Sequence, residues 1–408
     1  MRIKELHLTN IGPFNDAHLE FAADDAPRVT IITGENGTGK TIVLDAIRGL
    51  FGYYYSGNLG RSIFRQEQSF VIKGFVEYDN TRHELFSNSY ENPYFFKPNN
   101  HVLYSIPNDV QSSKKTVNWV LDYWGSTVSN EGFNIKSLSM PSTSNYLMNS
   151  LSGILSNTDL TQYICGFDYI RTSEDMEERN TGKFVYQVLE KIFAASLIDG
   201  GKLDAVKRIG YMPIILQNGQ KVPLQNLSSG NLYMIQRLVS LLSKMYAVHI
   251  LRKTPPETLC DTPGLLLIDE AENHLHPKWQ KRFIPTILDI FPNLQIIATT
   301  HSPFIVSSVE GAKVYVCKPH TDHCTIEDET DFYANKPVEE VLASPVFGTS
   351  PFGEEISKLL EERKKAINEN NEQERTRIEA RLKEENPQYF AYFDIDKRLE
   401  ALLEGAEQ

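Results

Sequence analysis

The chain has 408 residues, of which 41% are hydrophobic, so it can bury the core of one large α/β domain or of two smaller ones. Its net charge of −12 argues against a surface coated for nucleic-acid binding, although a local basic groove remains compatible with it. Four scattered cysteines argue against a disulfide framework and are typical of a reducing compartment. The opening residues lack a signal-peptide pattern, and no run reaches about 18 apolar residues, so we expect a cytoplasmic protein with no membrane contact.

Residues 1–80 predict three strands, a glycine-rich loop, a helix and a long strand over 69–78. The loop follows a buried apolar strand over 29–33 and matches the phosphate-binding P-loop. Its glycines let backbone N–H groups turn toward phosphate oxygens, and the helix N-terminus adds partial positive charge. We expect Lys40 to reach the β- and γ-phosphates and the Thr41 hydroxyl to ligate Mg²⁺. The residues expected to hold the nucleotide here are Gly34, Asn36, Gly37, Thr38, Gly39, Lys40 and Thr41.

Residues 81–204 predict an inserted subdomain. The composition of 81–165 shifts to Asn, Ser, Tyr and Pro, and its periodicity is weak, so we expect irregular structure with short helices there. A helix is expected over 175–200. Aromatic side chains usually fill cores, so we expect those of the insert to form its own small core rather than a base-stacking surface. They are Tyr94, Phe95, Phe96, Trp119, Tyr123 and Trp124.

Residues 205–350 predict the second half of the α/β domain, in which a strand around 211–216 is followed by a renewed α/β pattern over 227–307. An apolar run ends in Asp269 and Glu270, and ligands bind at the carboxyl ends of such buried parallel strands. We expect Asp269 to hold Mg²⁺, directly or through water, and Glu270 to polarise the water that attacks the γ-phosphate. The next apolar strand precedes His301, which we expect in a loop over the site, where it could sense or stabilise the γ-phosphate.

Residues 351–408 predict a charged helical tail with i,i+4 ion pairs on a solvated face. One apolar edge of this tail is suited to packing on the body of the protein or on a partner. It comprises Leu359, Leu360, Ile367, Ile378 and Leu382.

Three further segments carry a family resemblance. Residues 227–231, Leu-Ser-Ser-Gly-Asn, followed by Gln-Arg, resemble the signature loop of ABC-type ATPases, with Ser229 in place of the usual glycine. Residues 272–277 are similar to the Glu-x-His-Leu-His-Pro segment of ATPases of the overcoming-lysogenization-defect type, and residues 8–14 resemble the first strand of that group. With the P-loop and the acidic pair, the chain resembles ABC-type ATPases of the SMC, RecF and OLD-like group. More narrowly, it resembles the stand-alone ATPases of bacterial anti-phage systems of the Septu, PARIS or retron kind.

This resemblance implies an α/β ABC-type head with a parallel P-loop core sheet and an antiparallel β-subdomain. It also implies a head-to-tail homodimer with ATP between the subunits, in which Ser228 and Gly230 contact the γ-phosphate on the other subunit's P-loop. The loop over 273–276 would cross that interface. Gln68, or else Gln66, would contact Mg²⁺ and the attacking water. The implied catalytic residues are Lys40, Glu270 and His301, the implied metal ligands are Thr41, Asp269 and Gln68, and the cofactors are ATP and Mg²⁺.

The function implied by the resemblance is an ATPase that acts as sensor or scaffold for a partner effector, expected to be a nuclease, in antiviral defence. Nucleic-acid contact is then expected to be indirect. One alternative is a RecF-like ATPase of DNA repair that binds DNA itself. Another is a non-catalytic scaffold held together by ATP, against which the intact Glu270 and His301 argue. The basic residues available to the DNA-binding alternative are Arg61, Arg65, Lys73, Lys202, Lys207 and Arg208.

Two further patterns in the sequence are weaker. Residues 317–324 contain two cysteines and two histidines, but His323 and Cys324 would point to opposite faces of a strand, so a tight hairpin is favoured over a zinc site. Asp394 and Asp396 resemble the acidic pair of a Toprim nuclease domain. The charged tail lacks strand–helix alternation, so we expect any nuclease to be a separate chain.

Overall fold

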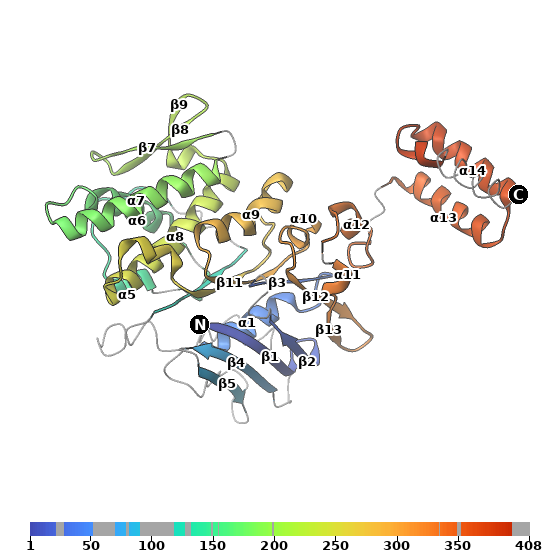
Figure 1. Ribbon diagram of the computed structural model, residues 1–408, viewed down its shortest axis with the longest axis horizontal. Coiled ribbons are helices and arrows are strands. Elements are labelled where there is room, and N and C mark those ends of the chain that lie inside the picture. The colour runs from blue at the N-terminus through green and yellow to red at the C-terminus, as the bar shows by residue number, and fades with distance from the viewer. Residues whose placement is uncertain are drawn as a thin grey trace, which may run out of the picture. The chain divides into compact units, whose positions relative to one another are not determined.

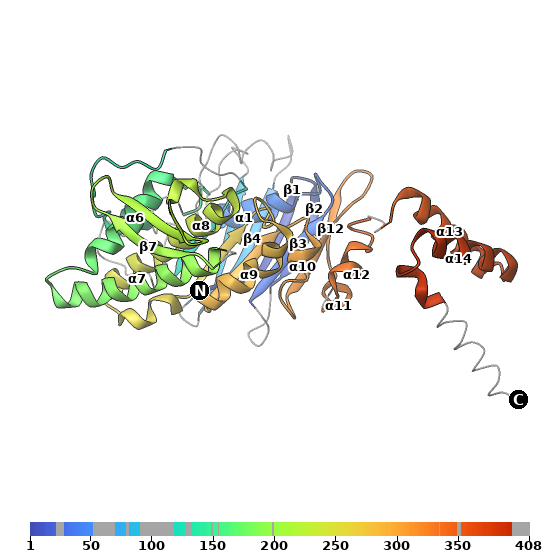
Figure 2. The ribbon, with the colours of Figure 1, turned by 90° about the horizontal axis from the view of Figure 1, so that it is seen from above.

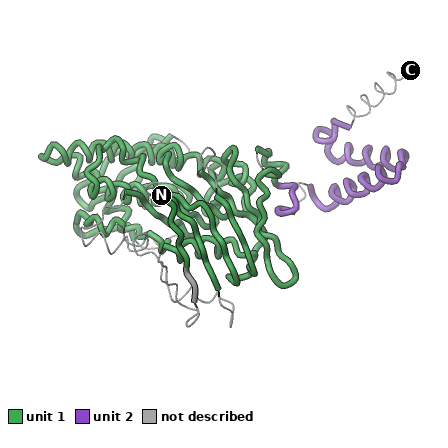
Figure 3. Tube along the Cα trace, turned by 60° about the horizontal axis from the view of Figure 1, so that its bottom comes forward, with its two compact units in different colours: residues 1–341 green, residues 342–408 purple. Residues whose placement is uncertain are grey.

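The computed structural model describes residues 1–21, 28–51, 70–78, 81–89, 118–126, 132–147, 150–153, 155–197, 200–333, 335–348 and 352–393. The chain forms two compact units, residues 1–341 and residues 342–408 (Figure 3). No helix in these ranges combines the length and the apolar composition that crossing a membrane needs.

Ten strands of the first unit form one sheet, in the order β5-β4-β1-β2-β13-β12-β3-β11-β10-β6 (Figure 1). Five neighbouring strands at the β6 end run parallel. Four of them are buried along their whole length, which explains why their sequences are almost continuous apolar runs. The parallel strands are β12 (Lys313–Pro319), β3 (Val29–Gly34), β11 (Leu294–Thr299), β10 (Gly264–Ile268) and β6 (Val120–Trp124).

The other half of the sheet is mainly antiparallel. Its strands alternate between buried and exposed residues, as in the pairs Leu6–Leu19 and His7–His18, because one face packs on the core and the other meets solvent. A parallel P-loop core joined to an antiparallel β-subdomain confirms the predicted fold class. The strands are β1 (Arg2–Ile11), β2 (Phe14–Glu20), β4 (Phe70–Tyr78), β5 (Thr81–Ser89) and β13 (Cys324–Asp328).

Helices cover the parallel strands (Figures 1 and 2). The P-loop helix packs on the sheet with nearly all of its residues buried, while three long helices pack on one another beside β6. A separate antiparallel sheet, β7 (Lys202–Lys207), β8 (Met212–Gln217) and β9 (Gln220–Pro223), precedes the longest of them. The helices are α1 (Lys40–Leu50), α5 (Thr143–Leu147), α6 (Asn157–Ile170), α7 (Met176–Ser196), α8 (Ser229–Arg252), α9 (Pro277–Ile290), α10 (Pro303–Val306), α11 (Thr330–Tyr333) and α12 (Val338–Leu342), with 3₁₀ turns η2 (Leu224–Asn226) and η3 (Pro256–Asp261).

The expectation of irregular structure is wrong for three elements between residues 81 and 165. β5 and β6 belong to the large sheet, and α6 is a regular helix capped by Ser156. Trp119 and Tyr123 accordingly lie in the main core rather than in a core of the insert, whereas Tyr94, Phe95 and Phe96 lie outside the described residues. β6 was missed because it is buried on both faces and therefore shows no alternation, and because it carries the polar residue Asp122. The domain boundaries at residues 80, 204 and 350 stay predictions.

The second unit contains a helical hairpin made of α13 (Glu354–Asn368), α14 (Glu372–Glu385) and the turn η4 (Tyr389–Ala391). Of the predicted apolar edge, Leu359, Ile378 and Leu382 are buried between these elements, and Ile367 is exposed. The edge therefore packs within the tail itself. The described aromatic residues Phe390 and Phe393 complete this small core.

Candidate active site

The P-loop joins β3 to α1. Three of its glycines have positive φ angles, 143° at Gly34, 79° at Gly37 and 94° at Gly39, which side chains rarely adopt. The loop is also tightly packed at its ends. A Cβ on Gly34 would lie 2.4 Å from the carbonyl oxygen of Cys317, and a Cβ on Gly39 would lie 2.7 Å from the Phe14 ring. The glycines thus create a close backbone cradle, while Gly37 and Asn36 are exposed at its tip.

Lys40 is buried at the first position of α1. Its Nζ donates hydrogen bonds to the carbonyl oxygens of Gly34 at 3.1 Å and Glu35 at 2.7 Å, so the ammonium group lies inside the cradle. Burial lowers its pKa, although the carboxylates of Glu272, Asp269 and Glu270 act in the opposite direction. The Thr38 hydroxyl closes the loop by donating to the Glu35 carbonyl at 2.8 Å.

Asp269 follows β10 and meets the P-loop helix. The Thr41 hydroxyl donates to its Oδ1 at 2.9 Å, and the Thr299 hydroxyl at the end of β11 donates to the same oxygen at 2.7 Å. The Tyr123 hydroxyl from β6 lies 3.5 Å from the other carboxylate oxygen. Three neighbouring parallel strands therefore converge on Asp269. Burial raises its pKa, and the hydrogen bonds from Thr299 and Thr41 counteract that effect.

Glu270 has a left-handed backbone conformation, with φ 51°, two residues after the end of β10. The Thr299 hydroxyl accepts a hydrogen bond from its backbone N–H at 2.9 Å. Asn273 donates from Nδ2 to Glu270 Oε2 at 2.5 Å. The carboxylate is half-buried and is oriented through one oxygen, which leaves Oε1 as the acceptor that is not used by Asn273.

His301 lies in the loop after β11, next to the same site. Its backbone N–H donates to Glu272 Oε1 at 2.7 Å, and the Thr300 hydroxyl donates to Glu272 Oε2 at 2.6 Å. Glu272 therefore fixes the start of this loop with both of its oxygens. Burial and the charge of Lys40 lower the pKa of the His301 imidazole, which favours its neutral form.

The signature segment begins α8. Ser228 is the exposed N-cap of this helix and accepts a hydrogen bond from the backbone N–H of Asn231 at 3.3 Å. A Cβ on Gly230 would lie 2.7 Å from the carbonyl oxygen of His274, so the signature packs against the loop over 273–276. Among the described residues, no hydrogen bond joins Ser228 or Gly230 to the P-loop of the same chain.

These residues suit a nucleotide with Mg²⁺. The cradle supplies inward backbone N–H groups and an ammonium group for phosphate, and the hydroxyl of Thr41 and the carboxylate of Asp269 are hard oxygen ligands 2.9 Å apart. Gln68 and Gln66 lie outside the described residues, as do Arg61 and Arg65. The predicted site residues that are described thus fall into two places, one around the P-loop and one at the start of α8.

The sequence patterns do not predict Thr299, Tyr123 or Glu272 as residues of the candidate site. They predict Tyr123 in the core of the insert, and they include Glu272 only as part of the segment over 272–277. Thr299 and Glu272 carried a usable signal, because each lies within two residues of a predicted catalytic residue. Tyr123 carried none, since nothing in the sequence indicates that β6 lies beside β10.

The weaker patterns have different outcomes. Residues 313–328 form the predicted hairpin, β12 with β13, in which Cys317 and Cys324 are buried in the core. The His320 and His323 rings stack on each other, with centroids 4.9 Å apart, away from the buried cysteines. Asp394 and Asp396 lie outside the described residues.

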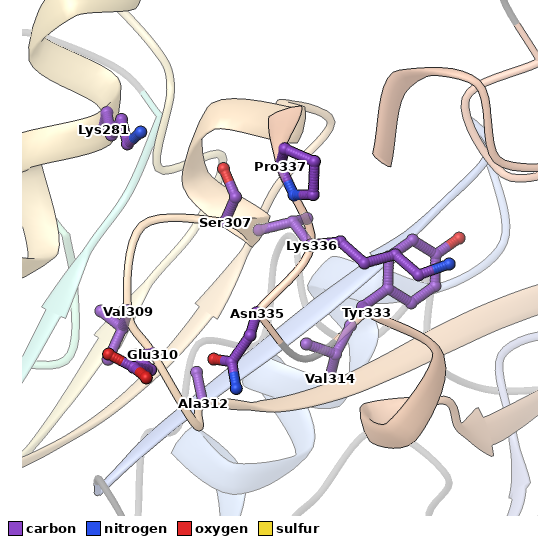
Figure 4. Close-up of a pocket in the computed structure, with 11 residues that line it drawn as sticks. Lys281, Ser307, Val309, Glu310, Ala312, Val314, Tyr333, Asn335, Lys336 and Pro337 are labelled. Carbon is purple, nitrogen blue, oxygen red and sulfur yellow. The ribbon is translucent and has the colours of Figure 1, made fainter. Parts of the chain in front are cut away.

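A separate pocket of about 380 Å³ lies beyond the His301 loop (Figure 4). Its walls come from α9, the end of α10 and the segments around β12 and α11. Lys336 and Tyr333 both line it, and Lys281 is contributed by α9. None of the predicted P-loop residues lines it, so this pocket is distinct from the candidate active site.

A protein family and several individual proteins are similar to this chain in sequence. A profile of the family described as "AAA domain, putative AbiEii toxin, Type IV TA system" matches residues 29–307. Septu protein PtuA of Bacillus thuringiensis is 25% identical over 346 residues, 77% of this chain and 78% of that protein. Retron Vc95 probable ATPase of Vibrio cholerae serotype O1 biovar El Tor is 28% identical over 148 residues, 36% of this chain and only 28% of that protein's length. The predicted resemblance to ATPases of Septu and retron systems is confirmed by these matches.

Among solved structures, the Smc head bound to the C-winged helix domain of ScpA is similar over 80% of this chain and 98% of that chain. The two share 14% sequence identity, and the TM-score is 0.48.

Proposed function

The chain belongs to this family of AAA domains, and on that premise we propose that it is a Mg²⁺-dependent ATPase that dimerises around ATP. We further propose that it controls a partner effector, a nuclease, in bacterial antiviral defence. The observation that carries the ATPase proposal is the hydrogen bond between Thr41 and Asp269, because it joins the P-loop helix to the acidic end of β10. The two residues that we propose as magnesium ligands, 228 residues apart in sequence, lie within hydrogen-bond distance of each other.

Each residue of the site has its own role in the proposed reaction. Lys40 binds phosphate oxygens in place of the carbonyl groups of Gly34 and Glu35. Thr41 and Asp269 would hold Mg²⁺, which when bound would supply positive charge against the phosphate oxygens. Glu270 accepts a proton from the attacking water at Oε1, while Asn273 keeps the carboxylate in place.

His301 completes this site as a neutral imidazole. Its Nδ1–H or Nε2–H donates a hydrogen bond to the γ-phosphate, and Glu272 positions the loop that carries it. A neutral donor suits this role, because the adjacent Lys40 already supplies the positive charge.

The dimer proposal rests on the signature segment. Ser228 and Ser229 are exposed at the N-terminus of a helix that runs to Arg252, so backbone N–H groups and the helix dipole face outward. Such an end attracts an anion, and the phosphate held by a second copy of this chain is the anion that the family resemblance implies.

Control of an effector is proposed from the relatives that are named as Septu and retron proteins. Expression of the chain together with the reading frames adjacent to its gene, followed by native mass measurement, tests this part. A stable complex with a second chain supports it and identifies the effector. If only this chain is recovered, with and without ATP and Mg²⁺, the effector proposal fails.

Dimerisation is tested separately on the purified chain. Glu270→Gln keeps the shape of the side chain but removes the base, so this variant should accumulate as an ATP-bound dimer in native mass spectra. Wild type should show the dimer only transiently, and Ser228→Arg, which blocks the exposed helix start, should abolish it in both backgrounds. A monomer for Glu270→Gln at saturating ATP would contradict the dimer proposal.

A further inference from the structure

We propose that the β1–β2 ladder carries a second metal site, for one Zn²⁺ ion, formed by Glu5, His7 and His18. The candidate ligand atoms of these three side chains all lie within 4.8 Å of one another. Two imidazoles with one carboxylate form a donor set typical of zinc, with a fourth position left for water or another ligand. The site is distinct from the magnesium site at Thr41 and Asp269.

The strand register creates this cluster. β1 and β2 are antiparallel, and His7 lies directly opposite His18. Glu5 lies two residues before His7, so its side chain shares the same face of β1. Leu6, Leu8 and their partners point to the core, which leaves the metal-binding face accessible to solvent. The two imidazole rings stack with centroids 4.0 Å apart and an angle of 13° between their planes.

The carboxylate of Glu5 is already oriented toward the histidines. Arg82 on β5 donates to its Oε1 at 2.8 Å, while its Oε2 lies 3.6 Å from His7 Nε2. Metal-binding carboxylates are commonly held in this way by a hydrogen bond to the oxygen that does not bind the metal. Arg82 also lies over the Phe75 ring, at 4.2 Å from its centroid, so the guanidinium group is itself fixed.

One lysine and two further glutamates lie near the cluster. Lys73 is the neighbour of His7 on the β4 side, but its ammonium group pairs with Glu84 at 3.2 Å. Glu20 lies opposite Glu5 in the register and adds a second carboxylate to this face. Zinc lies close to the plane of each imidazole that binds it, about 2.0–2.1 Å from the nitrogen. Binding one ion therefore requires the exposed His18 side chain to rotate out of its stack on His7, so that nitrogens of both rings converge on the metal.

A metal at this place would connect to the nucleotide site through the β1–β2 turn. A Cβ on Gly12 in that turn would lie 2.5 Å from the Ile42 side chain on α1, and the adjacent Pro13 and Phe14 pack on Gly39. An ion that links the two strands therefore stiffens the hairpin that supports the P-loop. The described residues contain no other group of three His, Cys, Asp or Glu side chains close enough to share an ion.

The test is titration of the full chain with ZnCl₂ after removal of metal by chelation, without a histidine tag and without nucleotide. Competition against a chromophoric zinc chelator gives the stoichiometry and the affinity. Wild type should bind one Zn²⁺ at this site, and His18→Asn should weaken that binding at least about tenfold. Both His18 and its ring partner are on the solvent-accessible face, so His18→Asn should leave the unfolding temperature in chelator unchanged.

His323→Asn is the matched control. His323 also stacks on a second histidine, and its Nδ1 lies 2.7 Å from Asp322 Oδ1, but among the described residues these three side chains do not form a group close enough to share an ion. This variant should bind zinc like wild type. Cobalt provides a second measurement, since Co²⁺ bound by wild type should show visible absorption bands that His18→Asn lacks. Zinc binding that is unchanged in His18→Asn, or that is lost in His323→Asn, would overturn the proposal, as would the absence of binding to wild type.

Discussion

At Asp269, burial and hydrogen bonding act on the same carboxylate in opposite directions. Burial favours the protonated acid, and the hydroxyl groups of Thr299 and Thr41 favour the charged carboxylate. A divalent cation adds to the second effect. Sequence reasoning could predict Asp269, Glu270 and His301, because each follows an apolar strand. It could not predict which side chains orient them, since Thr299 and Asn273 act through contacts that only the fold creates.

Substitution of Glu272 tests whether this side chain positions the His301 loop. Both of its oxygens accept hydrogen bonds from the His301 loop, and a glutamine can accept only one of them without reorienting. Glu272→Gln should therefore lower kcat for ATP hydrolysis about tenfold while the affinity for ATP stays within about twofold, because Lys40 and the cradle are intact. Steady-state phosphate release and binding of a fluorescent ATP analogue measure the two quantities. Glu310→Gln, on an exposed loop, serves as control.

At the scale of elements, the P-loop shows how a backbone can require glycine for two different reasons. Gly39 and Gly37 both have positive φ, but a Cβ would meet Phe14 and Pro13 only at Gly39. Gly39→Ala should cost about 1–3 kcal/mol of unfolding free energy and more than Gly37→Ala, which adds strain without a clash. Urea unfolding of the two variants measures the difference. Equal losses would show that the packing of the β1–β2 turn on the loop is unimportant.

A buried ion pair links β6 to α8. Lys244 Nζ lies 2.6 Å from Asp122 Oδ1, and both side chains are no more than 5% exposed. Lys244→Met should lower the unfolding free energy by about 3–5 kcal/mol, because it leaves the Asp122 charge buried without its partner. The double variant Lys244→Met/Asp122→Asn should recover part of that loss.

An exposed pair provides the control for this measurement. Lys191 and Asp289 lie 3.1 Å apart, and both are more than half exposed. Lys191→Met should change the unfolding free energy by less than about 1 kcal/mol. If Lys191→Met and Lys244→Met lowered the unfolding free energy by similar amounts, burial would not be the reason why the Lys244–Asp122 pair matters.

Some of the strands near this pair could be predicted from the sequence, and β6 could not. β3, β10 and β11 were predictable because turn residues or acidic residues bound their apolar runs. β6 contains Asp122 in its centre, and the ion-pair partner of this acid, Lys244, is 122 residues away in sequence. An ion pair between residues so far apart in sequence leaves no local pattern from which the strand could be predicted.

At the scale of the whole molecule, the chain divides into a large unit with the candidate active site and a small unit of helices. The small unit is held by its apolar core and by Glu379, whose Oε1 accepts hydrogen bonds from Arg363 at 2.9 Å and Arg375 at 3.0 Å. Helix formation in the tail was predictable from its charge pattern. Its folding into a hairpin was not, because the sequence leaves open what the apolar edge packs against.

Glu379 gives this unit a pH dependence. Burial acts to raise its pKa, but the hydrogen bonds from Arg375 and Arg363 outweigh burial and hold the pKa below the ordinary value of 4.5. The carboxylate therefore stabilises the folded unit at pH above about 4.5, and this contribution is lost as the pH falls through the lower folded-state pKa. Thermal unfolding of wild type and Glu379→Gln should differ most above the ordinary pKa of 4.5 and converge as the pH falls further below it. The exposed Glu384→Gln, on the same helix, should show no such convergence.

The measurement that tests the central claim most directly is phosphate release from ATP by the purified chain, with binding of ATP measured in parallel. Wild type with Mg²⁺ should turn over ATP, Lys40→Ala should lose both binding and turnover, and Glu270→Gln should bind ATP while its turnover falls at least about 100-fold. Turnover by Glu270→Gln equal to that of wild type, or ATP binding without any turnover by wild type, would contradict the proposed ATPase.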